Sequence, residues 1–235
     1  MATSFQPPEK PAGKTLDKPG GTTHHRREYT LPAGEGEDGK SMGQKLWEAQ
    51  AFEGLRHQDE TFTDLSFVDC EFTDCALEAC KLVRCTFTGC KFTRCRASEL
   101  KAEDSQLKYG EFFHCAVTGL DWGQIKPRGR FSEPISQLED CRLKYNTFPE
   151  MSLQKFDFSG NELAGCLFAE CALAESSFHE CLLTDTEFFQ CDLRRADFRG
   201  ASGYSIDISA NTLKGARFSY PEVVRLLDSL ELQID

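Results

Sequence analysis

Cysteine is the most reactive side chain in this sequence, and its spacing is regular. Six of the twelve cysteines follow one another at intervals of five residues: Cys70, Cys75, Cys80, Cys85, Cys90 and Cys95. Cysteine thiolates are common zinc ligands, and two thiols can join as a disulfide. Zinc sites use closely spaced cysteine pairs, whereas no two cysteines in this chain are closer than five residues. We therefore expect no metal site and no cofactor.

The other residues that could do chemistry do not form a catalytic set. The histidines of the repetitive region are His57, His114 and His179, and no nucleophile pattern accompanies them. The sequence also lacks a serine elbow and a Gly-rich phosphate-binding loop. We therefore expect a binding protein with no catalytic residues, and not an enzyme.

A large apolar residue also recurs every five positions, two residues after each cysteine. The first run of these central positions extends from Phe62 to Trp122, and the second extends from Leu138 to Phe218 with one gap near Gly203. An α-helix would spread a period of five around its circumference, and a strand would place alternate repeats on opposite faces. A coil that turns a corner every five residues keeps both the cysteine slot and the central position inside, where cysteine acts as a small hydrophobe.

The order of Phe and Leu at the central positions indicates how many units make one coil. Phe and Leu alternate from Phe148 to Phe198, so stacking every fourth unit places like residues above one another. This predicts one column of phenylalanines and one column of leucines. The columns are Phe158, Phe178, Phe198 and Phe218, and Leu153, Leu173, Leu193 and Leu213.

The repeat unit resembles that of the pentapeptide-repeat proteins, and the segment CDLRRADFRG, residues 191–200, is close to their consensus. The resemblance covers residues 62–218. It implies an all-β fold, a right-handed quadrilateral β-helix with four units per coil, here followed by a short C-terminal helix. In such a coil, cysteines four units apart, such as Cys70 and Cys90, stack with parallel side chains, so we expect free, buried and unreactive thiols.

The charge of the chain is unevenly distributed. The net charge is −11, and residues 1–45 hold seven basic and six acidic residues, so residues 46–235 carry −12. This argues against nucleic acid or an anionic membrane as the main partner. Two interpretations stay open, a solvated surface and an acidic recognition surface. Apolar runs are short, so we expect no membrane span or signal peptide, and a cytoplasmic location.

Composition divides the chain into segments. Residues 1–45 are rich in Pro, Gly and charge, which predicts a flexible tail. Residues 46–61 are expected to cap the coil, with a short helix formed by the apolar set Leu46, Trp47, Ala51, Phe52 and Leu55. The two stacks then cover residues 62–122 and 138–218. Between them, residues 123–137 are predicted to form a loop that contains a basic island, Lys126, Arg128 and Arg130, which is either a partner contact or an ordinary solvated loop.

The last segment, residues 219–235, predicts a helix and a short strand. Pro221 and Glu222 suit a first helical turn, and the apolar face looks larger than a plug for the coil needs. We therefore expect a homodimer. Its predicted contact residues are Val223, Val224, Leu226, Leu227 and Leu230.

Residues 203–235, GYSIDISANTLKGARFSYPEVVRLLDSLELQID, resemble the terminal segment of topoisomerase-protecting pentapeptide-repeat proteins. This branch includes the Qnr-type quinolone-resistance proteins, the mycobacterial gyrase-binding homologue and the microcin and albicidin immunity proteins. The resemblance implies DNA mimicry and a protein partner, DNA gyrase or topoisomerase IV. Outward acidic residues of the second stack, Asp185, Glu187 and Asp192, are candidate partner contacts. The alternative is a scaffold or a secreted effector that binds another protein.

Overall fold

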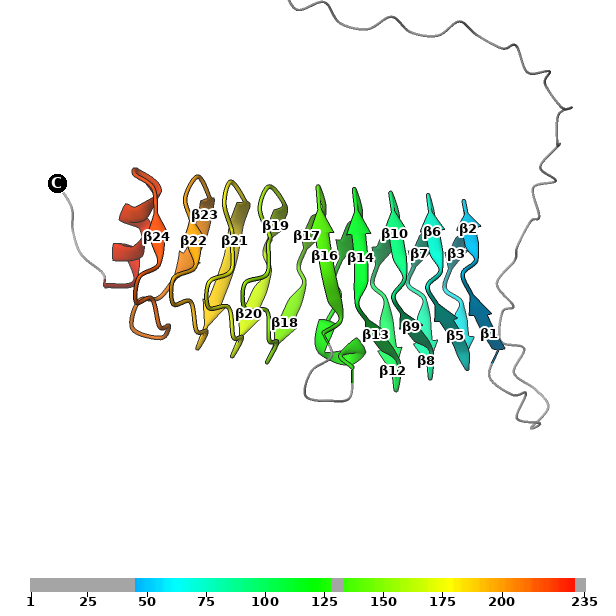
Figure 1. Cartoon of the computed structure of the whole chain (residues 1–235). Helices are drawn as coiled ribbons and strands as arrows, with labels where there is room; N and C mark the ends of the chain where they lie inside the picture. Colours follow the sequence, from blue (N-terminus) through cyan, green and yellow to red (C-terminus); the bar gives the residue numbers. More distant parts are fainter. Residues whose placement is uncertain (1–44, 128–132, 231–235) are drawn as a thin grey trace, which may run out of the picture.

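The computed structural model describes residues 45–127 and 133–230, which form one continuous β-solenoid of about eight coils. Figure 1 shows the coils stacked along a straight axis, with the first strand at one end and the C-terminal helix at the other. The predicted flexible tail apart from Lys45, Arg128, Arg130 and the predicted terminal strand all lie outside the described residues. Within the described residues, no helix combines the length and apolarity that crossing a membrane requires.

Each coil has four sides, which we call the first to fourth walls, and the strands of each wall are parallel. The first wall contains β1 (Lys45–Glu48), β5 (Leu65–Val68), β9 (Thr86–Thr88) and β13 (Gln106–Lys108). The second contains β2 (Ala51–Glu53), β6 (Glu71–Thr73), β10 (Lys91–Thr93), β14 (Gly110–Phe113) and β16 (Ile135–Glu139), and later β22 (Asp197–Phe198) and β24 (Arg217–Phe218).

The third and fourth walls complete the coil. The third contains β3 (Arg56–Gln58), β7 (Ala76–Glu78), β11 (Arg96–Ser98), β15 (Ala116–Thr118), β17 (Arg142–Lys144) and β19 (Glu162–Ala164). The fourth contains β4 (Thr61–Thr63), β8 (Lys81–Val83), β12 (Lys101–Glu103), β18 (Thr147–Pro149) and β20 (Leu167–Ala169). The long strand β21 (Leu182–Phe189) passes from the third wall to the fourth, and β23 (Ser202–Ile206) pairs with it.

The corners explain the period of five. The second residue after each central position adopts a left-handed backbone, as at Asp64 (φ 57°), Asp69 (φ 51°) and Asp74 (φ 54°). This conformation is tolerated best by Gly, Asn and Asp, and it bends the chain after each short strand. Four such bends close one coil, and backbone hydrogen bonds to the next coil, such as Asp64 N to Val83 O at 3.0 Å, hold each corner.

The interior confirms both predicted inward positions. Eleven of the twelve cysteines are buried and Cys95 is half-buried. Phe158, Phe178, Phe198 and Phe218 stack in one column with ring centroids 4.7, 4.8 and 5.1 Å apart. Stacked aromatic rings and the leucine columns fill the coil with like side chains, as the alternation of Phe and Leu predicts.

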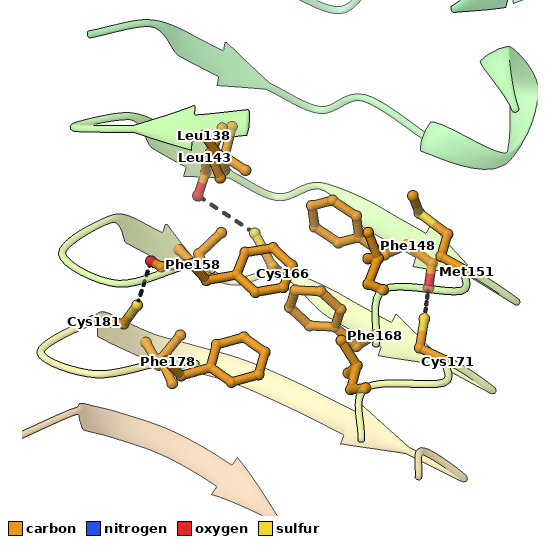
Figure 2. Close-up of a cluster of buried hydrophobic side chains, with 14 of the residues drawn as sticks. Leu138, Leu143, Phe148, Met151, Phe158, Cys166, Phe168, Cys171, Phe178 and Cys181 are labelled. Carbon is orange, nitrogen blue, oxygen red and sulfur yellow. Dashed lines mark hydrogen bonds between the residues drawn. The ribbon is translucent and has the colours of Figure 1, made fainter. Parts of the chain in front are cut away.

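The buried thiols also donate hydrogen bonds to backbone carbonyl groups of the preceding coil. Figure 2 shows Cys166, Cys171 and Cys181 donating to the carbonyls of Leu143, Phe148 and Phe158, at 3.4, 3.0 and 2.8 Å. Burial raises the pKa of Cys166 to about 11 and the pKa of Cys181 to about 12. These two thiols are therefore neutral near pH 7, and they link one coil to the next without exposing sulfur.

The predicted capping helix is wrong, because residues 45–63 form four strands, β1 to β4. Packing against the next coil favours strands over a helix in this segment. The ring of Trp47 lies 4.9 Å from that of Phe67, and the ring of Phe52 lies 5.0 Å from that of Phe72. The next central position is held by His57, whose Nδ1 pairs with Glu60 at 3.0 Å. Because a polar residue holds this central position, the five-residue apolar pattern does not reveal the first coil in the sequence.

The interruption does not divide the solenoid. A 3₁₀-helix, η1 (Trp122–Ile125), leaves the fourth wall, and the chain returns as β16 at Ile135, within the range predicted as a loop. β14 pairs with β16 and β15 pairs with β17 across the insertion. The coil that contains the insertion is longer than the others, since Val117 is in register with Leu143 on one side and with Ala97 on the other.

Near the C-terminus the repeat loosens. Ile208 is expected at a central position, but Phe188 is in register with Ile206, and both Tyr204 and Ile206 are buried. The register shifts within β21, next to Gly203 with its φ of 77°. A left-handed glycine permits this shortened coil, because the strand no longer follows the five-residue spacing. The predicted terminal helix is present as a 3₁₀-helix, η2 (Glu222–Leu230).

Candidate functional site

The C-terminal half of the fourth wall carries carboxylates and no basic residue. It consists of β18, β20 and the second half of β21, where Leu167 is in register with Thr147 and Glu187. The three segments read TFPE (147–150), LFAE (167–170) and DTEFFQ (185–190), without Lys or Arg. We call their outward residues the acidic wall. Its acidic members are Glu150, Glu170, Asp185 and Glu187, and its apolar members are Pro149, Leu167, Ala169 and Phe189.

Backbone geometry fixes how two of these carboxylates are presented. Glu150 and Glu170 are left-handed corner residues of neighbouring coils, with φ of 49° and 56°. The backbone N–H of Glu150 donates to Ala169 O, and that of Glu170 donates to Phe189 O, each at 2.8 Å. The two exposed side chains therefore stand one coil apart, about 4.8 Å along the axis. Like charges at this spacing repel, and a cationic partner would relieve the repulsion.

Apolar surface lies between these charges. The Phe189 side chain is 49% exposed, and Pro149, Leu167 and Ala169 are half-buried. Aromatic residues are frequent energetic centres of protein interfaces. The acidic wall thus combines charge, which attracts a partner, with apolar area, which can hold it.

The structure brings together two of the three acidic candidates. Asp185 and Glu187 are exposed on the acidic wall. Asp192 lies on the first wall instead, where it bridges to Ala172 and Thr212 of the neighbouring coils. Arg194 donates to both carboxylate oxygens of Asp192, at 2.8 and 2.7 Å, and lowers the pKa of that carboxyl. The charge of Asp192 is therefore already neutralised within the chain.

The basic island begins at the edge of the acidic wall. Lys126 follows η1, and its Nζ donates to the carbonyl of Glu150. Gly123 packs against Pro149 so closely that a Cβ on Gly123 would lie 2.6 Å from the Pro149 ring. The insertion therefore docks on the first coil of the acidic wall. The other two members of the island, Arg128 and Arg130, lie outside the described residues.

The N-terminal half of the fourth wall is different, because its acidic residues are paired. Arg84 binds both carboxylate oxygens of Asp64 at 2.7 and 2.8 Å, and Lys81 pairs with Glu103 at 2.6 Å. Exposed ion pairs contribute little to stability, but they neutralise the charge that a partner would meet. Uncompensated negative charge on this wall is therefore concentrated in its C-terminal half.

The predicted dimer residues lie on η2, but only two of the five are exposed. Val224 and Leu230 are 40% and 44% exposed, and Val223 and Leu227 are half-buried. Leu226 packs against the core of the solenoid. The helix is fixed to β23, since Arg225 Nε donates to Tyr204 O at 3.2 Å and Gly203 N donates to Glu222 Oε2 at 3.3 Å. Part of its apolar face therefore caps the coil, and the rest faces outward.

Sequence reasoning missed Glu150, Glu170 and Phe189. The available signal was the separation of Glu150 and Glu170 by four repeat units, which places them on the same corner of successive coils. The predicted acidic candidates, Asp185, Glu187 and Asp192, lie in neighbouring repeat units, and neighbouring units face different walls.

The match to a protein-family model agrees with the repeat. The family described as Pentapeptide repeats matches residues 70–107 and 162–200 as eight copies. No curated protein matches the chain. Among solved structures, QnrB1, a plasmid-mediated fluoroquinolone resistance protein, is 15% identical over 83% of this chain and 100% of its own, with a TM-score of 0.36.

Two cyanobacterial structures are also similar. HetL of Nostoc, a pentapeptide-repeat protein involved in heterocyst differentiation regulation, is 11% identical over 74% of this chain and 85% of its own, with a TM-score of 0.26. Rfr23 of Cyanothece, also a pentapeptide-repeat protein, is 14% identical over 55% of this chain and 60% of its own, with a TM-score of 0.22. The matched repeats lie within one continuous four-walled solenoid, and the chain is therefore a pentapeptide-repeat protein.

Proposed function

We propose that this chain is a non-enzymatic DNA mimic that acts in the bacterial cytoplasm. It binds a type II topoisomerase, DNA gyrase or topoisomerase IV, and protects it from inhibitors such as quinolones or peptide toxins. The observation that carries the proposal is the acidic wall, a column of carboxylates on a rigid rod whose three segments contain no Lys or Arg. The resemblance of residues 203–235 to topoisomerase-protecting proteins supports the choice of partner.

The shape of the rod fits a groove that normally holds duplex DNA. About eight coils at about 4.8 Å give a rod roughly 40 Å long. Duplex DNA carries one negative charge per about 1.7 Å of its axis, and proteins bind it with clusters of Lys and Arg. The acidic wall offers fewer charges than DNA, but it offers them on a scaffold whose backbone hydrogen bonds already fix their positions. A cationic groove would therefore bind it without ordering a flexible chain.

The insertion has a role in the same proposal. Lys126 lies at the edge of the acidic wall, so a partner that covers Glu150 also meets the first residue of the basic island. Replacing the island tests whether it contributes to protection separately from binding. If the variant still binds the topoisomerase but no longer protects it, the basic island acts on the drug-stalled complex and not in binding.

A supercoiling assay tests the proposed function. Gyrase inhibited by a quinolone or by albicidin should regain activity when the full chain is added, and bovine serum albumin at equal concentration should have no effect. If binding to gyrase occurs without relief of inhibition, the chain binds the enzyme but does not protect it. If gyrase and topoisomerase IV are neither bound nor protected, the alternative, a scaffold or effector with another protein partner, takes the place of the proposal.

We further propose that the outward face of η2 forms a homodimer. Leu227→Asp places a carboxylate in this face, and burying an unpaired charge costs several kcal/mol. The variant should therefore sediment as a monomer at concentrations at which the native chain is a dimer. Asp228→Asn, a change at the neighbouring exposed position, is the control and should keep the native mass. A native chain that stays monomeric, or a Leu227→Asp variant that keeps the mass of a dimer, would show that η2 only caps the coil.

A further inference from the structure

An apolar cavity of about 120 Å³ lies inside the N-terminal half of the solenoid, and Ala97 of the third coil, residues 85–104, is one of its lining residues. The cause of the cavity lies at Ala97, a lining residue that holds a central position occupied by Leu or Phe in most other units. Ala97 is in register with Leu77 and Val117 of the adjacent coils, and Ala102 is in register with Leu82. The aromatic and aliphatic side chains of the adjacent coils stay in their stacked positions. The volume that a larger central side chain would fill therefore remains empty. The cavity is lined by Phe92, Phe112 and Trp122, among others.

Of the buried polar side-chain atoms that line the cavity in the described residues, one lacks a hydrogen-bond partner. Ser105 Oγ accepts from Cys85 N at 2.9 Å and donates to Glu103 O at 3.2 Å. The thiols of Cys95 and Cys115 donate to carbonyls of the preceding coil at 3.3 and 3.4 Å. The indole Nε1 of Trp122 is buried without a hydrogen-bond partner in the described residues. One donor is fewer than the two to four partners that a buried water molecule needs.

The wall beside the cavity is interrupted. β12, which carries Ala102, pairs with β8 on one side only, because the following coil has η1 at this place in the wall and not a strand. The N–H of Ala102 is met by the side chain of Gln124, with a distance of 3.2 Å to Oε1. A side chain is easier to displace than a strand, and that of Gln124 is held only by this bond and by a longer one, at 3.5 Å, from its Nε2 to Asp121 Oδ2 among the described residues. Movement of Gln124 and η1 would therefore give a small molecule access to the interior.

We propose that the third coil is a binding site for one compact apolar molecule of about the size of benzene. Cavities of about 150 Å³ with aliphatic and aromatic linings stay dry and bind benzene or xenon. The cavity described here has the same kind of lining and a similar volume, and its contents would replace packing contacts that Ala97 does not make. Because such a ligand binds the folded chain only, its binding raises the melting temperature.

Benzene is the probe for this site, and the full chain is the material. We expect saturable chemical-shift changes for residues that line the third coil, together with an increase in melting temperature. Ala97→Leu fills the space, so this variant should melt at a higher temperature than the native chain without benzene and should show no further increase with it. Ala116→Leu adds the same side chain at an outward position of the third wall and should respond to benzene like the native chain.

The response of the native chain to benzene is the decisive measurement. Absence of saturable shifts at the third coil up to the solubility of benzene would overturn the proposal, whatever the variants do. Retention of the full benzene response by a folded Ala97→Leu variant would place the binding site elsewhere and would also contradict the proposal. The proposal is independent of topoisomerase binding, because neither the probe nor the readout involves the acidic wall.

Discussion

Cys80→Arg is expected to prevent folding of the solenoid, whereas Cys80→Ala should lower the free energy of unfolding by about 1 kcal/mol. The Cys80 side chain is fully buried, and its thiol donates to Glu78 O at 3.4 Å. Arginine at this slot must bury a guanidinium group without a partner and must also fit a longer side chain into packed space. Each effect costs several kcal/mol, and together they approach the whole stability of a typical domain, about 5–15 kcal/mol.

Glu78→Arg is the matched control for this change. Glu78 lies two residues earlier in β7 and is exposed, so the same side chain there points into solvent. This variant should fold with native circular dichroism and a urea midpoint close to that of the native chain. A soluble, cooperatively unfolding Cys80→Arg variant would contradict the inward assignment of the cysteine slot.

Reversing the charge of the acidic wall should remove topoisomerase binding without affecting the fold. The triple variant Glu150→Lys, Glu170→Lys, Glu187→Lys changes only exposed side chains. Placing like charges opposite a cationic groove costs several kcal/mol, so we expect the dissociation constant to rise at least about 100-fold, which corresponds to about 2.7 kcal/mol. Calorimetric titration against gyrase measures the loss, and thermal unfolding shows that the fold is intact.

The control for this variant makes an equal change of net charge on another wall. Glu53→Lys, Glu71→Lys and Glu139→Lys together alter exposed residues of the second wall. If the acidic wall is the contact surface, this variant should keep most of its affinity. Equal losses in both triple variants would mean that net charge, and not this wall, determines binding.

The sequence determines the repetitive architecture because the five-residue unit repeats the same local requirements. A small residue in the slot, a large residue at the centre and a corner residue that tolerates a left-handed backbone are enough to predict the coil and its Phe and Leu columns. The helix predicted for residues 46–55 failed because Trp47 and Phe52 fit both a helical face and the five-residue period. Contact with Phe67 and Phe72 of the next coil, which is tertiary packing, selected strands.

The candidate functional surface was less predictable, because residues far apart in the chain form it. The acidic wall joins Glu150, Glu170 and Glu187, while neighbouring acidic residues such as Asp192 face other walls and pair with basic side chains. The insertion also lengthens one coil, so residues before it cannot be assigned to a wall by counting repeat units back from the second stack. The cavity has a visible cause in Ala97, but whether the neighbouring columns would collapse around it depends on packing that the sequence does not show.

The salt dependence of direct binding to purified gyrase tests the central claim most directly. Electrostatic attraction between the acidic wall and a cationic groove is screened by added ions. We expect the dissociation constant of the full chain to increase at least about tenfold between about 50 mM and about 300 mM salt, and the acidic-wall triple variant to show no binding at either concentration. A chain that does not bind gyrase or topoisomerase IV at low salt, or whose affinity is unchanged by salt, would contradict DNA mimicry as its function.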